Sequence, residues 1–385
     1  MDSQKKKIII IGPAYPYRGG NSLYISFVFE TLSKEFEVKI FNYKLLYPSF
    51  LFPGKTQFDI SGEVKKIPSE RIVNSLHPFN WIRVASRINY EKPDLIIFDW
   101  WHPYFALCHF FISLFINKKL KKRSLFITEN YISHEGHFID RWLTRIGLHH
   151  ANYFIALSKK VEDELKQNFK HKKIYRSELP IYEHLTGNAE DITSLKQKFS
   201  IAPNEKVLLF FGYIRKYKGL DILLEALNLL SSESDKIKLI IAGEFYDDKD
   251  FYIELIHKYE LQNIVIMQNE YIPNEQVKDY FIVSDVVVLP YRSATQSGIL
   301  NLAYGFRKPV IVTKVGGLSE FVNNESTGLI VEQPKAELIA DAIKKFFEIE
   351  NKIDFRKNIA EFVKSNRFNN LNEIINKVLE DSNAS

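Results

Sequence analysis

Two series of short apolar runs constrain the fold of this chain more than any other feature. The first series comprises Ile8–Ile11, Val38–Phe41, Leu95–Phe98, Ser124–Thr128 and Tyr153–Leu157, and the second comprises Val207–Phe211, Lys238–Ala242, Ile264–Met267, Val286–Leu289 and Val310–Thr313. Helical patterns such as Ser22–Glu35 and Leu220–Ser231 lie between the runs. Strands buried on both faces appear as continuous apolar runs, and their alternation with helices indicates parallel sheets. We therefore expect an α/β protein with two doubly wound, Rossmann-like domains.

The chain divides at a polar stretch between the two series. Its 385 residues suit two domains of ordinary size. Residues 182–205 are polar and contain the turn signal Ala202-Pro203-Asn204. We predict an N-terminal domain over residues 1–185, a linker over 186–205, a second domain over 206–350 and C-terminal helices over 351–385.

A basic loop follows the strand predicted at Val207–Phe211. Arg215 and Lys218 lie in this loop, just before a helix that begins near Gly219. Ligands of open α/β sheets bind beyond the carboxyl ends of the strands, and a helix N-terminus attracts anions. Two cations at such a point suit a diphosphate. The alternative is a solvated surface loop with two ordinary basic residues.

Further segments give the chain a resemblance to a known family. They are the strand and glycine loop KKIIIIGPAYPYRGG at the N-terminus, the strand KLIIAGE at Lys238–Glu244 and the run Ser284–Val322. With the basic loop, and in this order, they resemble nucleotide-sugar glycosyltransferases of family 4, which have the GT-B fold.

The resemblance implies two domains that face a central cleft, with a C-terminal helix that crosses back to the first domain. It implies that Arg215 and Lys218 bind the donor diphosphate and that Gly19 and Gly20 close over the donor phosphates. It also implies a nucleoside-diphosphate sugar as donor substrate, no cofactor and an acceptor bound by the first domain. From the residues alone, a tight turn explains the two glycines equally well.

The predicted donor site departs from the family pattern. Two glutamates that are usual in family 4 align with Ala294 and Leu302, and Thr295-Gln296-Ser297-Gly298 stands in this region. A hydroxyl and free backbone N–H groups at the start of a helix can hold an oxyanion. We therefore expect Ser297 and Gly298 to contact the diphosphate. For the donor sugar or ribose we expect uncharged contacts and one remaining carboxylate, from Gln296, Asn301 and Glu320.

The loop after Ser124–Thr128 holds the candidate catalytic groups. Glu129 aligns with a histidine that many family members have here, and His134, Glu135 and His137 follow. We expect Glu129 and His134 to transfer a proton or to hold the acceptor hydroxyl. A metal site is the alternative, but the spacing is loose and no second cluster supports it, so we predict no metal. A solvated loop with incidental polar residues is a further alternative.

The loop after Leu95–Phe98 contains Trp101 and His102. Aromatic faces suit the C–H faces of a pyranose, and by analogy with the family we place both residues on the acceptor side. Core packing at the domain edge explains them equally well.

Charge is shared unequally between the two halves. Residues 1–180 hold 28 Lys and Arg against 17 Asp and Glu, a net +11, whereas the rest hold 24 against 30, a net −6. The segment His102–Arg123 joins an apolar run to five cations and is interpreted either as a helix in a membrane interface or as a buried helix followed by a basic turn. We expect peripheral contact with anionic lipid through the basic N-terminal domain. We expect no nucleic-acid partner, because no motif for one is visible.

The single cysteine, Cys108, lies in an apolar run and fits a small core residue in a reducing compartment. No secretory signal and no apolar stretch near the ~20 residues that span a bilayer are apparent. We therefore expect a cytoplasmic protein, peripheral at the inner face of the membrane.

The resulting hypothesis is a retaining glycosyltransferase that moves a sugar from a nucleoside-diphosphate donor to an acceptor hydroxyl of a glycan or a lipid-linked substrate. Retention is implied by the resemblance. One alternative is a sugar-nucleotide epimerase on the same fold. Another is a nucleotide-binding subunit without activity, which the missing glutamates and histidine would explain.

Overall fold

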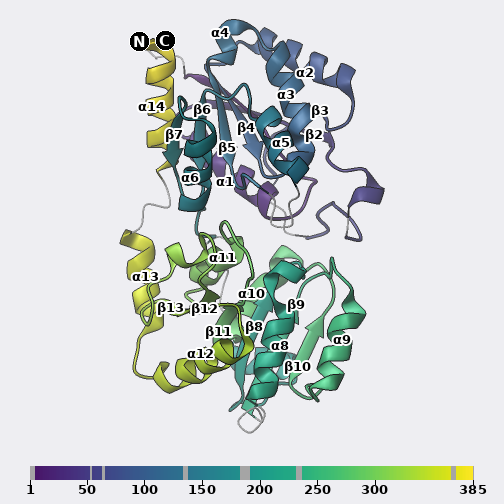
Figure 1. Ribbon diagram of the computed structural model, residues 1–385, viewed down its shortest axis with the longest axis vertical. Coiled ribbons are helices and arrows are strands. Elements are labelled where there is room, and N and C mark those ends of the chain that lie inside the picture. The colour runs from purple at the N-terminus through teal and green to yellow at the C-terminus, as the bar shows by residue number, and fades with distance from the viewer. Residues whose placement is uncertain are drawn as a thin grey trace. The chain divides into compact units, whose positions relative to one another are not determined.

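The computed structural model describes residues 5–52, 54–62, 66–132, 138–182, 191–230, 236–365 and 370–384. Tertiary contacts divide the chain into two units. Unit 1 comprises Met1–Asp59, Val64–Pro180 and Phe368–Ser385, and unit 2 comprises Ile60–Glu63 and Ile181–Arg367. Each unit is built around its own parallel sheet (Figure 1).

Unit 1 contains a seven-stranded parallel sheet in the order β3-β2-β1-β4-β5-β6-β7. Its strands are β1 (Lys7–Ile11), β2 (Glu37–Leu45), β3 (Glu70–Asn74), β4 (Leu95–Trp100), β5 (Ser124–Thr128), β6 (Tyr153–Ala156) and β7 (Lys173–Arg176). Its helices are α1 (Gly20–Ser33), α2 (Pro78–Glu91), α3 (Ala106–Phe115), α4 (Lys118–Lys121), α5 (Phe138–Gly147), α6 (Lys159–Asn168) and α14 (Leu371–Ala384), with 3-10 turns η1 (Ser49–Leu51) and η2 (Pro103–Phe105). The chain therefore reverses the strand order between β1 and β4, which is where ligands of doubly wound sheets bind.

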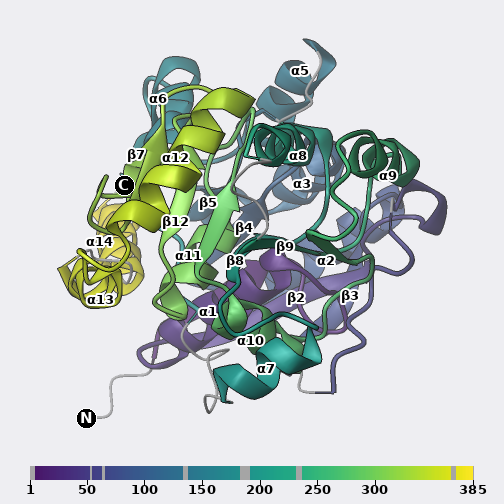
Figure 2. The same cartoon turned by 90° about the horizontal axis from the view of Figure 1, so that it is seen from below.

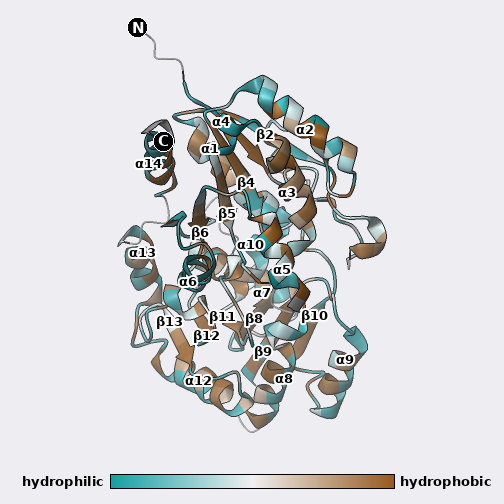
Figure 3. Ribbon diagram, turned by 45° about the horizontal axis from the view of Figure 1, so that its top comes forward, coloured by the Kyte–Doolittle hydropathy of each residue, from teal (hydrophilic) through white to brown (hydrophobic). Residues whose placement is uncertain are grey.

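Two apolar clusters cover the faces of this sheet. One face packs on α1 and α14 through residues such as Ile25, Val28 and Ile375, and the other packs on α2, α3 and α6 through residues such as Val84 and Ile112. Side chains alternate along each strand, so Ile97 contributes to the first cluster and Phe98 to the second. Figure 3 shows the resulting hydrophobic strands between helices of mixed character.

Unit 2 contains a six-stranded parallel sheet in the order β10-β9-β8-β11-β12-β13. Its strands are β8 (Lys206–Phe211), β9 (Ile237–Ala242), β10 (Val265–Gln268), β11 (Val286–Leu289), β12 (Val310–Thr313) and β13 (Gly328–Val331). Its helices are α7 (Ile192–Lys198), α8 (Leu220–Leu229), α9 (Lys249–Lys258), α10 (Asn274–Val283), α11 (Gly298–Gly305), α12 (Ala336–Ile349) and α13 (Phe355–Ser365), with turns η4 (Lys216–Lys218) and η6 (Leu318–Phe321). Helices α8, α9 and α12 lie on one face of this sheet, and α7 and α10 on the other (Figure 2).

The two parallel sheets confirm the predicted α/β class with two Rossmann-like units. The range predicted as a linker, 186–205, contains α7, which belongs to unit 2. The range 351–385 is shared, because α13 belongs to unit 2 and α14 to unit 1. Helix α14 joins the far end of the chain to unit 1 by packing Ile374, Ile375 and Val378 against the cluster that α1 covers.

The segment interpreted as an interfacial or a buried helix forms α3 and α4. Helix α3 buries Cys108, His109 and Ile112 against the sheet, while Leu107 and Leu114 are exposed. No helix in the described ranges is long and apolar enough to cross a membrane.

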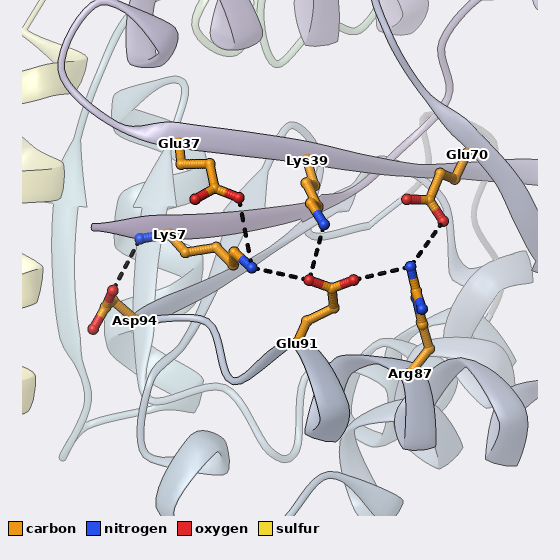
Figure 4. Close-up of polar contacts among 7 residues, drawn as sticks. All are labelled: Lys7, Glu37, Lys39, Glu70, Arg87, Glu91 and Asp94. Carbon is orange, nitrogen blue, oxygen red and sulfur yellow. Dashed lines mark hydrogen bonds and ion pairs between the residues drawn. The ribbon is translucent and has the colours of Figure 1, made fainter. Parts of the chain in front are cut away.

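An ion-pair network closes the amino end of the unit 1 sheet (Figure 4). Glu91, at the end of α2, accepts hydrogen bonds from Lys7 Nζ at 3.0 Å and Lys39 Nζ at 2.9 Å, and Arg87 lies 2.9 Å from its other oxygen. Lys39 and Lys7 hold the pKa of Glu91 down at about 2, chiefly through the hydrogen bond from Lys39. The network joins β1, β2 and α2 at the amino end of the sheet, opposite the loops that follow the carboxyl ends of the strands.

Candidate functional site

The loop between β8 and α8 carries Arg215 and Lys218. Gly219 ends η4 and precedes α8 with a φ of 70°. A Cβ at this glycine would lie 2.1 Å from the carbonyl oxygen of Pro290, so the loop requires glycine here. The tight turn places the basic loop against the residues that follow β11.

Lys218 is a buried cation. Its side chain is enclosed, with the residue only 8% exposed, and its Nζ lies 5.8 Å from the centre of the Tyr291 ring. No carboxylate forms an ion pair with it among the described residues. Burial, and then the neighbouring Arg215, lower the pKa of Lys218 to about 7. A cation kept away from water without an anion is suited to receive one from a ligand.

The start of α11 lies beside this lysine. Gly212, directly after β8, lies against both Lys218 and α11. A Cβ placed on it would lie 3.3 Å from Lys218 Nζ and 3.2 Å from Ile299 Cδ1. Ser297 caps the helix by accepting a hydrogen bond from the Leu300 N–H at 3.4 Å. Open space surrounds Gly298, since nothing lies within 4 Å of a Cβ added there. The helix N-terminus and the buried cation are thus both close to the end of β8.

The other predicted donor residues lie around the same strand ends. Asn301 is buried in the first turn of α11, and Gln296 is half-buried just before it. Arg215 lies over the ring of Tyr246, 5.2 Å from its centre, and that ring stacks on Tyr213. Glu320 is exposed in η6, after β12.

In unit 1, the loop after β1 begins α1 at a glycine pair. Gly19 has a φ of 99° and is the N-cap of α1, and nothing lies within 4 Å of a Cβ added at Gly20. Arg18 is buried beside them and lies 5.7 Å from the centre of the Phe52 ring. The backbone at the start of α1 is therefore open to a ligand.

Glu129 lies at the carboxyl end of β5 with a second buried carboxyl, Asp99, on β4. Asn21, in the first turn of α1, donates a hydrogen bond to Glu129 Oε1 at 2.9 Å. Asp99 is fully buried, and neither of its carboxyl oxygens has a hydrogen-bond partner among the residues described. Burial raises the pKa of Glu129 to about 8 and, together with repulsion from Glu129, raises the pKa of Asp99 well above its usual range. This pair, Asp99–Glu129, therefore lies next to the strand-order reversal with the pKa of both carboxyls raised.

The sequence did not single out Asp99. It directly follows an apolar run and is separated from Glu129 by the helices α3 and α4, so only the pairing of β4 with β5 brings the two together. The signal available in the sequence was a carboxylate directly after four apolar residues of a predicted buried strand. His134, Glu135 and His137 lie outside the described residues.

Trp101 and His102 are held by contacts within unit 1. Trp101 donates a hydrogen bond from Nε1 to Tyr47 Oη at 3.0 Å, and its ring packs on Phe105 at 4.2 Å between centres. His102 accepts a hydrogen bond at Nδ1 from the Tyr104 N–H at 3.1 Å and so caps η2. Each residue has a structural role, and the exposed edge of His102 adjoins the end of β4. No group of three or more His, Cys, Asp or Glu side chains suited to a metal occurs in the described ranges.

Comparisons with known proteins agree with this geometry. A model of the family "Glycosyl transferases group 1" matches residues 191–366. The chain is 30% identical over 159 residues to a D-inositol 3-phosphate glycosyltransferase of Pseudarthrobacter chlorophenolicus, an alignment covering 40% of this chain and 38% of that protein. It is 29% identical over 199 residues to a putative teichuronic acid biosynthesis glycosyltransferase, TuaC, of Bacillus subtilis, covering 51% and 47%. The alignments thus span less than half the length of these relatives.

Solved structures resemble the whole chain. HepE of Anabaena in complex with UDP-glucose has a TM-score of 0.74 at 18% identity, covering 97% of this chain and 99% of that one. A sucrose-phosphate synthase of Thermosynechococcus elongatus has a TM-score of 0.73 at 17% identity, covering 99% and 100%. At these identities the likeness concerns the fold. The chain therefore has the GT-B fold of glycosyltransferases, and its residues 191–366 match the group 1 family.

Proposed function

We propose that the protein is a glycosyltransferase that moves a sugar from a nucleoside-diphosphate donor to an acceptor hydroxyl, with retention at the anomeric carbon. The observation that carries this proposal is Lys218, a buried cation without an anion that lies beside Arg215 and the start of α11. A donor diphosphate supplies the missing negative charge. Arg215 adds a second cation, and the backbone around Ser297 and Gly298 adds hydrogen-bond donors.

The same groups would act on the chemical step. When the bond between the sugar and the diphosphate breaks, negative charge grows on the leaving phosphate. Groups already aimed at that charge lower the barrier, and the loss of one such donor typically costs on the order of 10²–10³ in rate. Gln296, Asn301 and Glu320 are proposed to bind the donor sugar or ribose. Gly19 and Gly20 are proposed to approach the donor phosphates.

Glu129 is proposed to take part in proton transfer at the acceptor hydroxyl. A carboxyl whose pKa is raised to about 8 can both lose and hold a proton near neutral pH. No protein nucleophile is required if the acceptor attacks from the side of the leaving group. His134 remains a second proposed proton-transfer group, and Trp101 and His102 remain proposed acceptor contacts.

Several relatives support a nucleotide-sugar donor and a glycan product. HepE was solved with UDP and with UDP-glucose, and the starch synthase IV catalytic domain of Arabidopsis thaliana was solved with ADP and acarbose. Relatives named for teichuronic acid and lipopolysaccharide synthesis support a role in polysaccharide or glycolipid synthesis. We accordingly propose a glycan or lipid-linked acceptor, a cytoplasmic location with peripheral membrane contact, and no cofactor. The epimerase and the inactive binding subunit are not favoured.

Thermal unfolding with UDP, GDP and ADP tests the donor site. A ligand at a hundred times its Kd stabilises the folded state by about 2.7 kcal/mol, which raises Tm by several degrees. We expect one nucleotide to raise Tm, and Arg215→Ala to abolish the shift. Arg356→Ala, an exposed arginine on α13 of the same unit, is the matched control and should keep it. If none of the three nucleotides raises Tm, the proposed donor class is wrong.

A further inference from the structure

Tyr291 contacts both halves of the proposed diphosphate site. It follows β11, the strand beside β8 in the unit 2 sheet (Figure 1), and the residue is only 3% exposed. The centre of its ring lies 5.8 Å from Lys218 Nζ. Its hydroxyl shares a hydrogen bond with Ser297, the N-cap of α11. One side chain thus joins the buried cation to the start of the helix.

The backbone on either side of this ring is fixed by hydrogen bonds. The Thr313 hydroxyl, at the end of β12, donates a hydrogen bond to the Tyr291 carbonyl at 2.6 Å. The Arg292 N–H donates to the Tyr217 carbonyl at 2.6 Å. The Tyr217 ring meets the Tyr291 ring at 6.0 Å between centres and 78° between planes. The segment after β11 and the basic loop are therefore packed together, which leaves the Tyr291 ring little freedom to move.

The ring favours the charged form of Lys218. Burial, and then Arg215, lower the pKa of Lys218 to about 7, and no carboxylate pairs with this lysine in the described ranges. An aromatic face attracts an ammonium group, and the attraction corresponds to roughly threefold to thirtyfold in an equilibrium constant. The Tyr291 ring therefore opposes the two influences that disfavour the cation.

The other charged groups around Lys218 come from several elements. Arg215 is on the same loop. Asp221, in the first turn of α8, accepts hydrogen bonds from both terminal nitrogens of Arg292 at 2.7 and 2.6 Å, so its charge is already paired. Glu244 lies just after β9, the other neighbour of β8, and the first turn of α11 carries no titratable side chain. Of these groups, Arg215 shifts the pKa of Lys218.

The hydroxyl of Tyr291 acts on the other half of the site. Burial, and then Tyr217, raise the pKa of Tyr291 above its ordinary 10.0, so the hydroxyl stays protonated at neutral pH. Its partner Ser297 accepts a hydrogen bond from the Leu300 N–H at 3.4 Å. Open space surrounds Gly298 between them. A serine held from both sides fixes the direction in which the first N–H groups of α11 point.

We propose that Tyr291 is a positioning residue of the donor site, whose ring holds the Lys218 ammonium in place and whose hydroxyl holds the start of α11 through Ser297. The spacing of the two anion-binding groups is then set before the diphosphate arrives, and such preorganisation is what makes electrostatic stabilisation effective. The inference rests on the proposed function, because it requires a diphosphate at Lys218. It deepens that function by assigning the geometry of both groups to one residue.

Isothermal titration calorimetry with UDP, GDP and ADP tests the role of the ring. Tyr291→Leu keeps an apolar side chain but removes the aromatic face, and we expect the Kd of the nucleotide that binds to rise roughly tenfold. Tyr291→Phe keeps the ring and loses one hydrogen bond, so Kd should rise only about threefold. Tyr280→Leu is the matched control. Tyr280 is a tyrosine of α10 that is 5% exposed and packs on Phe199, and this variant should bind like the wild type.

The pH dependence of Kd separates positioning from a purely structural role. In the wild type, affinity should fall as pH rises above about 7, because Lys218 loses its proton. In Tyr291→Leu the fall should begin at lower pH, since no aromatic face attracts the ammonium, and in Tyr291→Phe it should begin at the wild-type pH. Ionisation of the nucleotide itself is common to all variants. A merely structural role would weaken binding equally at every pH.

A second substitution tests the role of the hydroxyl. In a Ser297→Ala background, Tyr291→Phe should weaken binding no further, because the partner of the hydroxyl is already gone. If the losses in the two variants multiply instead, the hydroxyl does not act through Ser297. This comparison does not need Tyr291→Leu, so it also tests the proposal if the leucine variant fails to fold.

Three results would overturn the proposal. They are wild-type affinity in Tyr291→Leu, an equal loss in Tyr291→Leu and Tyr280→Leu, and a pH profile that Tyr291→Leu leaves unchanged. If the wild type binds none of the three nucleotides, the proposed donor class is wrong as well. If it binds one and the Tyr291 variants bind that nucleotide equally well, only the inference about Tyr291 fails.

Discussion

Two groups of carboxylates at opposite ends of the unit 1 sheet have opposite electrostatics. At the amino end, Glu91 is 6% exposed at its side chain and is bonded to Lys7, Lys39 and Arg87 (Figure 4). At the carboxyl end, Asp99 and Glu129 are both buried. The Asn21 amide donates a hydrogen bond to Glu129, and no cation pairs with either carboxyl within the described residues. The pKa of Glu91 falls to about 2, whereas that of Glu129 rises to about 8. Burial raises the pKa of Glu129, whereas at Glu91 the hydrogen bonds from Lys39 and Lys7 outweigh the effect of burial and lower the pKa.

The difference separates a stabilising site from a functional one. A carboxylate with cations and hydrogen bonds stabilises the fold in its charged form. A buried carboxyl pair without a cation destabilises the fold once it ionises, and such arrangements persist where proton chemistry or ligand binding uses them. The position of the Asp99–Glu129 pair beside the strand-order reversal supports a functional role for it.

The largest expected effect is on catalysis. Glu129→Gln keeps the shape of the side chain and its contact with Asn21 but removes its acid–base function. We expect the transfer rate to fall by on the order of 10²–10⁴, measured as kcat with the donor that the Tm screen identifies. Glu91→Gln, the matching change at the other end, should leave kcat of the folded protein unchanged. A Glu129→Gln enzyme with normal kcat would remove this residue from the reaction.

The next effect is on stability at the amino end. Glu91→Gln leaves Lys7, Lys39 and Arg87 without their shared acceptor, and we expect the free energy of unfolding to fall by roughly 1–3 kcal/mol at pH 7. The pKa of Glu91 is lower in the folded chain than its ordinary 4.5, so its contribution is present above pH 4.5 and is lost as pH falls towards 2. Urea unfolding at several pH values measures both the loss of unfolding free energy at pH 7 and its dependence on pH. A mutant with wild-type acid sensitivity would mean that other carboxylates control acid unfolding.

Asp99→Asn should act in the opposite direction and more weakly. The pKa of Asp99 is raised in the folded state, so the wild-type residue destabilises the fold as pH rises above its ordinary value of 3.8. The amide cannot ionise, and we expect unfolding free energy at pH 7 to rise by about 1 kcal/mol and to depend less on pH between 4 and 8. Parallel unfolding curves for wild type and Asp99→Asn across this range would contradict the assignment.

The smallest effect concerns the most exposed partner of Glu91. The Arg87 side chain is 43% exposed, and its pair with Glu91 is of the i,i+4 type within α2. Arg87→Gln should cost only about 0.5 kcal/mol and should lose its effect at high salt. Thermal unfolding at two salt concentrations tests this. A cost as large as that of Glu91→Gln would show that the cations of the network are not equivalent to ordinary surface charges.

The sequence predicted the central strands and one of the four edge strands. Runs such as Ile8–Ile11 and Leu95–Phe98 are apolar because both of their faces are buried. The edge strand β10 was predicted from its apolar run, whereas the edge strands β3, β7 and β13 were not among the predicted runs. β7 is buried at no position and β3 only at Val73, so polar residues interrupt their pattern, and β13 is largely buried but very short. An apolar run therefore identifies a strand only where the run is uninterrupted and long enough to stand out.

The candidate site was predictable to a similar degree. Arg215 and Lys218 follow a recognisable strand and precede a helix, so their place at the end of β8 could be inferred from local order. The burial of Lys218 could not, because it depends on Tyr291 and on the turn at Gly219 against Pro290. The Asp99–Glu129 pair likewise depends on strand pairing, which a local pattern does not contain.

Cys108, the single cysteine, has a practical consequence. Its thiol is buried on the inner side of α3, and burial raises its pKa, so it remains protonated and out of reach of labelling reagents. The native chain can thus serve directly as a cysteine-free background for site-specific dyes. One cysteine introduced on an exposed position of each unit would accept a donor and an acceptor fluorophore, and energy transfer could follow the distance between the units as nucleotide is added.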